Sequence, residues 1–114
     1  MTPLEILFHR ISFEYDDHIQ RLARRHRYPM PRAIRWRQMA ANDPRGAVGA
    51  AKQLMLSPTA QSGFTELWLF GNTIGQDLIG KYSVEATMLE ERFRILFEDD
   101  ELIEAQRRID AHRR

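Results

Sequence analysis

The sequence contains no cysteine in its 114 residues. This absence excludes disulfide bonds and metal sites built on thiolates. A basic leader is also missing, and Glu5 interrupts the first apolar residues, so we expect no signal peptide. The longest apolar stretch, residues 64–71, contains Thr65 and Glu66 and is too short to cross a bilayer. We therefore expect a cytoplasmic protein that makes no membrane contact.

The chain also lacks recognisable catalytic and cofactor-binding patterns. Its four histidines form no His-x-x-x-His or Glu-x-x-His unit of the kind that helical metal sites use; they are His9, His18, His26 and His112. No serine lies within the glycines of a nucleophile elbow. The glycine pair Gly71 and Gly75 lacks the lysine of a phosphate-binding loop. We expect a protein that is not an enzyme and that binds no metal and no cofactor.

Charge is distributed unevenly along the chain. The net charge is only +1. Residues 1–57, however, hold 10 basic and 5 acidic side chains, whereas residues 58–114 hold 7 and 11. Of the 17 basic residues, 15 are arginine. Because arginine binds carboxylates and phosphates in two-point geometry, the basic half suits an acidic protein surface or a nucleic acid.

Apolar residues recur at helical spacing along the chain, which predicts an all-α fold. Good N-cap residues precede proline at Thr2-Pro3, Asp43-Pro44 and Ser57-Pro58, the pattern that begins helices. Thr2 and Glu5 also match a capping box. We expect one compact domain, residues 1–114, that forms a bundle of five or six helices. Their expected ranges are 3–27, 31–41, 45–56, 58 or 63 to 80, 83–97 and 98–108.

The longest apolar stripes lie in segments 3–27 and 63–80, and we expect these two helices to form the centre of the bundle. Trp68 belongs to the second stripe and is expected in the core. Segment 45–56 is rich in glycine and alanine, which predicts a thin helix of moderate stability.

Two features predict self-association. Ile6 and Phe13 form a second stripe on the first helix, and a helix that is apolar on two sides is central in its bundle or buried at an interface. Gly71 and Gly75 lie one turn apart in the predicted helix 63–80 and would permit another helix to approach closely. We expect a homodimer, because so short a chain supplies few partner surfaces of its own.

The segment from residue 21 to residue 37 contains seven arginines and no acidic residue. Its first part predicts a basic patch, which comprises Arg21, Arg24, Arg25 and Arg27. Its second part mixes arginine with tryptophan, tyrosine and methionine, a composition enriched in the cores of protein interfaces. We expect a partner-binding surface there, made of Tyr28, Met30, Arg32, Arg35, Trp36 and Met39.

These features favour a small regulatory or adaptor protein that binds another protein, one with an acidic surface. A nucleic-acid-associated regulator that uses the basic segment 21–37 is the alternative. A helix-turn-helix is not favoured, since segment 45–56 offers glycine and alanine rather than base-reading side chains. An accessory subunit of an enzyme or a phage assembly chaperone would show the same sequence features, so both functions stay open as alternatives.

Overall fold

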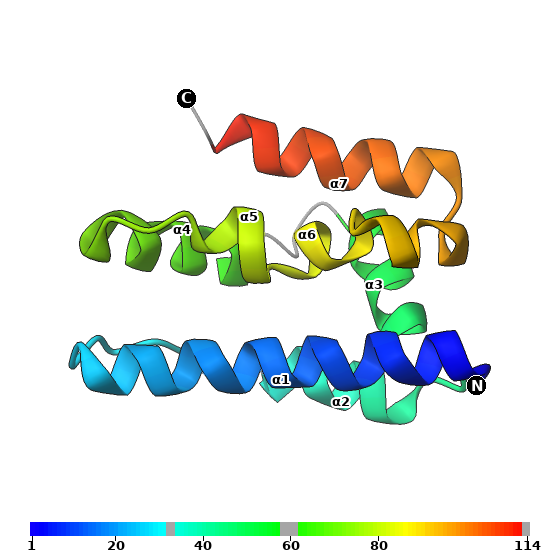
Figure 1. Cartoon of the computed structure of the whole chain (residues 1–114), viewed down its shortest axis with the longest axis horizontal. Helices are drawn as coiled ribbons and strands as arrows, with labels where there is room; N and C mark the ends of the chain where they lie inside the picture. The colour runs from blue at the N-terminus through cyan, green and yellow to red at the C-terminus, as the bar shows by residue number, and fades with distance from the viewer. Residues whose placement is uncertain (32–33, 58–61, 113–114) are drawn as a thin grey trace.

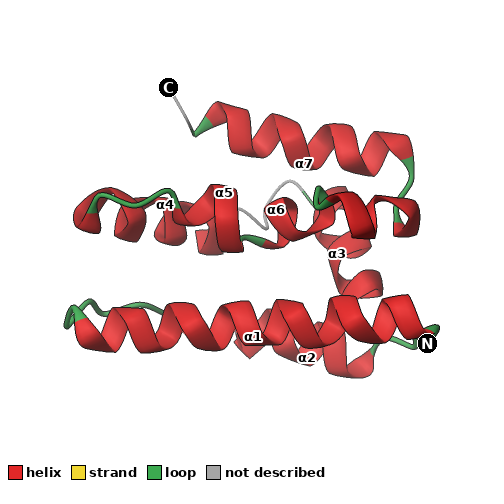
Figure 2. Ribbon diagram, in the orientation of Figure 1, coloured by secondary structure: helices red, strands yellow, loops and turns green. Residues whose placement is uncertain are grey.

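The computed structural model describes residues 1–31, 34–57 and 62–112. Their regular secondary structure is helical throughout, which confirms the all-α prediction (Figure 2). The described residues form seven α-helices and one 3₁₀ helix, which are shorter and more numerous than expected. They are α1 (Pro3–Arg25), α2 (Ile34–Asn42), α3 (Ala47–Leu56), α4 (Ser62–Ile74), α5 (Leu78–Tyr82), α6 (Val84–Met88), η1 (Glu91–Leu96) and α7 (Asp99–Ala111).

The helices are stacked in three layers (Figure 1). α1 spans the length of the molecule and forms one outer layer with α2. α4, α5 and α6 follow one another in the middle layer, and α7 lies on the opposite side. α3 crosses between the layers and contacts α1, α2, α6 and α7.

Three predicted helix starts are confirmed. Thr2 Oγ1 accepts the N–H of Glu5 at 3.2 Å, and the Glu5 carboxylate accepts the N–H of Thr2 at 2.8 Å, which closes the capping box of α1. Ser83 Oγ accepts the N–H of Ala86 at 3.0 Å and caps α6. The last helix begins in the acidic run, with Glu98 as its N-cap.

The predicted N-cap role of Asp43 is wrong, because α3 begins only at Ala47. The chain turns tightly instead. The Asp43 carboxylate accepts the N–H of Arg45 at 2.8 Å, and the Asp43 carbonyl accepts the N–H of Gly46 at 2.9 Å. Gly46 then adopts a φ of +60° to enter α3, a conformation that glycine reaches without steric cost.

A histidine from α1 supplies the cap that α3 lacks. His9 Nδ1 accepts the N–H of Ala47 at a donor–acceptor distance of 3.0 Å. Stacking on Phe13, with ring centroids 4.5 Å apart, holds the imidazole in place. A Cβ at position 46 would lie 2.6 Å from His9 Nδ1, so Gly46 also leaves room for the ring. The contact ties the start of α3 to α1.

We expect His9→Phe to lower the free energy of unfolding by about 0.5–2 kcal/mol, the usual cost of losing a helix cap. Phenylalanine keeps a ring that can stack on Phe13 but offers no acceptor to Ala47. Urea denaturation followed by circular dichroism measures the change. The matched control is His26→Phe, because His26 is exposed at the end of α1. If His26→Phe lowered the free energy of unfolding as much as His9→Phe does, the hydrogen bond to His9 Nδ1 would contribute nothing to stability.

The predicted continuous helix over residues 63–80 is wrong. α4 ends at Ile74, and Gly75 adopts a φ of +71°. The N–H of Gln76 then bonds back to the Gly71 carbonyl at 2.9 Å, as in a Schellman helix end with glycine at C′. The chain restarts as α5 at Leu78.

The predicted helix over residues 83–97 is divided as well. α6 ends at Met88, and Glu90 has an extended backbone with a ψ of 135° before η1 begins. Two aromatic rings here are buried: Phe93 within η1 and Phe97 directly after it. The break therefore lets this segment direct two aromatic rings into the core.

Two apolar clusters form the core, and α1 contributes to both. Phe8 packs in the first cluster with residues of α3, α6, η1 and α7. Ile19 and Leu22 pack in the second cluster with residues of α4, α5 and α7. The expectation that the first helix and the 63–80 segment form the centre therefore holds only for the second cluster.

α3 is more central than its small residues predict. Ala47, Val48, Ala50 and Ala51 are fully buried in the first cluster. Their short side chains allow the backbone of α3 to pass close to its four neighbours. Glycine and alanine in this helix therefore reflect close packing.

Trp68 is not at the centre of the core, contrary to expectation. Its ring is half-buried at the edge of the second cluster. Phe70, two residues later, is fully buried instead. Two residues along a helix turn the side chain by about 200°, so the burial of Phe70 leaves Trp68 on another face.

Candidate functional site

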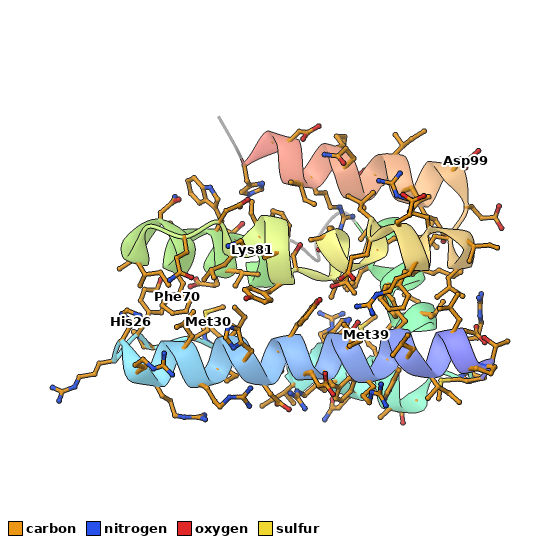
Figure 3. The ribbon with its side chains drawn as sticks, viewed as in Figure 1. His26, Met30, Met39, Phe70, Lys81 and Asp99 are labelled. Atoms are coloured by element: carbon orange, nitrogen blue, oxygen red, sulfur yellow. The ribbon has the colours of Figure 1, made fainter. Side chains whose placement is uncertain are left out.

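Exposed arginines gather at the end of the molecule where α1 stops. They are Arg21, Arg24 and Arg25 on the last turns of α1 and Arg27 just after it, and all are exposed. Within the described part of the chain, none of them forms an ion pair. We call this group the arginine end. Figure 3 shows the same end of the molecule, where His26 lies near Met30 and Phe70.

The local fold holds the arginine end in place. Arg27 adopts a φ of +53°, and the N–H of Tyr28 bonds back to the carbonyl of Ala23 at 2.9 Å. The Tyr28 ring then stacks on Phe70, with centroids 4.7 Å apart. Gln20 Nε2 donates to the carbonyl of Pro31 at 3.2 Å, which fixes the returning chain against α1. The arginines therefore project from an anchored helix end.

Other arginines of the basic half are neutralised within the chain. Arg37 lies between Asp16 and Asp17, with N–O distances of 2.6 and 2.5 Å. Arg45 pairs with Glu5 at 2.5 Å. Bonds from the Thr2 backbone and from Arg45 lower the pKa of Glu5 to about 2. Among the described arginines of residues 1–57, those of the arginine end and Arg35 are therefore the ones that form no ion pair.

The predicted partner-binding surface is not assembled as one exposed face. Tyr28 and Met30 pack against the second cluster, whereas Trp36 and Met39 pack against the first. Arg35 is exposed on the first turn of α2, which begins about halfway along α1 and away from the arginine end (Figure 1). The remaining predicted member, Arg32, lies outside the described residues.

Trp36 is turned toward α1. Its ring lies 5.2 Å from the ring of Phe13, and the Arg37 guanidinium lies 4.8 Å from the same Phe13 ring. Trp36 Nε1 is buried and has no hydrogen-bond partner among the described residues. The ring is therefore part of the α1–α2 contact, which sequence spacing alone did not reveal.

The residues predicted for self-association are placed differently from each other. Ile6 is exposed, but Phe13 is covered by His9 and Trp36 of the same chain. A Cβ on Gly71 would lie 2.5 Å from the Gln76 carbonyl oxygen, so the chain's own turn occupies that side. Gly75 lies beyond the end of α4. The prediction that Gly71 and Gly75 share one helix face is wrong, because the helix stops between them.

A cavity of about 360 Å³ lies beside the turn between α4 and α5. Trp68 and His112 line one part of it, with ring centroids 5.6 Å apart. The described residues that complete the lining are Gly71, Asn72, Gly75, Gln76, Asp77, Leu78 and Ile79. None of the arginine end lines this cavity, so the two features are separate.

A buried arginine connects three helices. Arg108 of α7 is 4% exposed, and its Nη2 donates to the Leu54 and Ser57 carbonyls at the end of α3, at 2.9 and 3.2 Å. Its Nη1 lies 3.6 Å from the carboxylate of Glu85 on α6. Burial raises the pKa of Glu85. A cation at a helix C-terminus also favours the helix dipole of α3.

Arg107 and Arg108 both lie at the end of the predicted helix 98–108, where a cation favours the helix dipole, so this position did not distinguish the buried arginine from the exposed one. A signal was present in the spacing. Arg108 lies three residues after Ala105 and next to Ile109, and all three are buried. A charge within an apolar stripe predicts a buried ion pair, because isolated buried charges are too costly.

Within residues 1–31, 34–57 and 62–112, no group of three or more histidine, cysteine or acidic side chains is placed to hold a metal ion. Across the same ranges, no helix has both the length and the apolar character needed to cross a membrane. No protein family model, no curated protein and no solved structure matches the chain.

Proposed function

We propose that the chain is a non-catalytic protein-binding module of the adaptor or regulator kind, and that its arginine end docks on an acidic surface of a partner protein. One observation carries this proposal. The arginines of this end are exposed and unpaired in the described structure, whereas Arg37 and Arg45 are neutralised internally. Arginine forks bind carboxylates in two-point geometry, and arginine is enriched at protein interfaces.

Two further features favour a protein over a nucleic acid. Ile34, which begins α2 next to Arg35, is 57% exposed, and an apolar side chain gains more from a protein surface than from phosphates. α3, the helix that would have to enter a DNA groove in a helix-turn-helix, is buried in the first cluster. An accessory subunit or assembly chaperone would use the same mode of binding.

A variant with Arg24→Glu and Arg25→Glu tests the proposal. We expect it to fold normally but to bind its partner at least about tenfold more weakly, because reversed charges repel an acidic surface. The measurement is affinity purification from the native host after nuclease treatment, followed by titration of the recovered partner. Arg10→Glu with Lys81→Glu is the matched control, since both residues are exposed and lie elsewhere. Equal binding by the reversed variant and this control would contradict the proposal.

A nucleic-acid-associated regulator is the second candidate, since the same unpaired arginines would neutralise phosphates. Its prediction differs in salt dependence. Titration of labelled DNA and RNA would show tight binding that weakens steeply between about 50 and 200 mM salt, because each neutralised phosphate releases counterions. Binding of a specific sequence that persists at the higher salt would favour this second candidate.

A further inference from the structure

The corner where η1 meets α7 exposes two large apolar side chains. Ile95 is 85% exposed and Ile103 is 69% exposed. Each lies opposite a buried face of its own helix, since Phe93 of η1 and Ala105 of α7 are fully buried. The chain's own fold therefore leaves both isoleucines uncovered.

Acidic residues lie close to both isoleucines in the sequence. Glu91, Asp99 and Asp100 are exposed, and none of the three forms an ion pair within the described residues. Two neighbouring carboxylates already form ion pairs within the chain: Glu90 pairs with Arg92, and Glu101 pairs with Lys52. We call Glu91, Ile95, Asp99, Asp100 and Ile103 the isoleucine corner.

The arginine end and the isoleucine corner lie at opposite ends of the molecule. Figure 3 shows His26, beside the arginine end, and Asp99, in the isoleucine corner, at the two ends of the longest axis. The molecule extends 37 Å along that axis. Within the described residues, the arginine end carries four exposed arginines without an ion pair, whereas the isoleucine corner carries three exposed carboxylates without one and a single such arginine, Arg94. Two copies can therefore pair unlike charges when opposite ends meet.

We propose that the arginine end of one copy docks on the isoleucine corner of a second copy, so that copies associate head to tail. This inference rests on the proposed protein-binding role of the arginine end. Contacts between two like ends would place like charges together and are disfavoured. Because the two surfaces differ, the contact is heterologous and leaves one arginine end and one isoleucine corner unoccupied in each dimer, so association continues to longer chains or closes as a ring.

This geometry differs from the symmetric dimer expected through Ile6, Phe13, Gly71 and Gly75. The structure covers Phe13 within the chain and separates Gly71 from Gly75 by a helix end. Head-to-tail docking needs none of these residues. It also explains why the two halves of the sequence can carry opposite net charge while the whole chain stays near neutrality.

Two complementary variants test the proposal by their behaviour alone and in mixture. The first, Arg24→Glu with Arg25→Glu, has an altered arginine end and an intact corner. The second, Ile95→Lys with Ile103→Lys, has an altered corner and an intact arginine end. All four positions are exposed, and circular dichroism checks that both variants fold. Sedimentation velocity and light scattering over a wide concentration range measure the mass.

We expect the wild-type mass to rise with concentration above the 13.5 kDa of one chain, and to fall back as salt increases from about 0.05 to 0.5 M. Each variant alone should remain a monomer. An equimolar mixture should form one-to-one pairs and nothing larger, because each variant contributes one intact surface. A wild-type chain that is monomeric throughout, or variants that each dimerise alone, would overturn the proposal.

Disulfide trapping gives an independent measurement, because the natural sequence has no cysteine. Arg21→Cys mixed with Ile103→Cys should form mixed disulfide dimers faster than either variant forms its own. Equal rates would count against head-to-tail docking. A monomeric chain whose host partner still depends on Arg24 and Arg25 would overturn only this inference and would leave the proposed function in place.

Discussion

Arg108→Met should lower the free energy of unfolding by about 3–5 kcal/mol, the range seen when one partner of a buried ion pair is removed. Methionine fills much of the space but donates no hydrogen bond. The Leu54 and Ser57 carbonyls would lose the Arg108 donor, and the buried Glu85 would lose its cation. Urea denaturation at neutral pH measures the loss.

Arg107→Met is the matched control, because Arg107 is the neighbouring residue and its side chain is 58% exposed. Its pair with Glu104 is a surface pair, so we expect a loss of no more than about 1 kcal/mol. Adding Glu85→Met to Arg108→Met should recover part of the larger loss, because no unpaired carboxylate then stays buried. Equal losses in the two single variants would show that the buried network adds nothing to stability.

The Arg108→Met variant should also change the pH dependence of stability. Burial already raises the pKa of Glu85, and removal of the cation would raise it further. The folded state then holds a proton that the unfolded state has released. Stability of the variant relative to the wild type should therefore be greatest below the ordinary glutamate range and should fall as pH rises through the raised pKa of Glu85.

Phe8→Ala should lower the free energy of unfolding by about 3–5 kcal/mol, the usual cost of truncating a fully buried aromatic ring. Phe8 is the centre of the first cluster. Its ring meets Phe93 at 5.2 Å and Phe97 at 5.3 Å, both edge to face. Truncation would open a cavity where α1 meets η1, and thermal or urea denaturation measures the loss.

Ile6→Ala on the same helix is the comparison for Phe8→Ala. Ile6 is half exposed, so its truncation should cost less than about 1 kcal/mol. If the two variants lost similar stability, the first cluster would not be organised around Phe8. A larger loss from Ile6→Ala at high protein concentration than at low concentration would instead indicate that Ile6 lies in a contact between copies.

Part of the candidate site could be predicted from the sequence. The four arginines predicted as a basic patch are exposed, at the end of a long helix where cations favour the dipole. The described residues of the predicted partner-binding surface do not form one exposed face. Tyr28 and Trp36 are close in sequence, yet they pack in different clusters, since the chain reverses at Pro29 and Pro31 and carries α2 back along α1.

Local chemistry determined several elements without tertiary information. The all-helical class follows from apolar spacing, and the starts of α1 and α6 follow from the side chains of Thr2 and Ser83. Each of these features depends on hydrogen bonds between residues three or four apart. The sequence alone therefore contains both partners of each interaction.

Only the tertiary structure decided which helices break, which are central and which charges are neutralised. α3 is capped by His9 and is central because its small side chains allow close packing, and Arg108 reaches carbonyls more than fifty residues away. Gly75 and Glu90 end helices that apolar spacing would have continued. The physical reason is common to all of these. Burial, caps supplied by another helix and long-range ion pairs depend on partners that the fold brings together, and sequence spacing records only local neighbours.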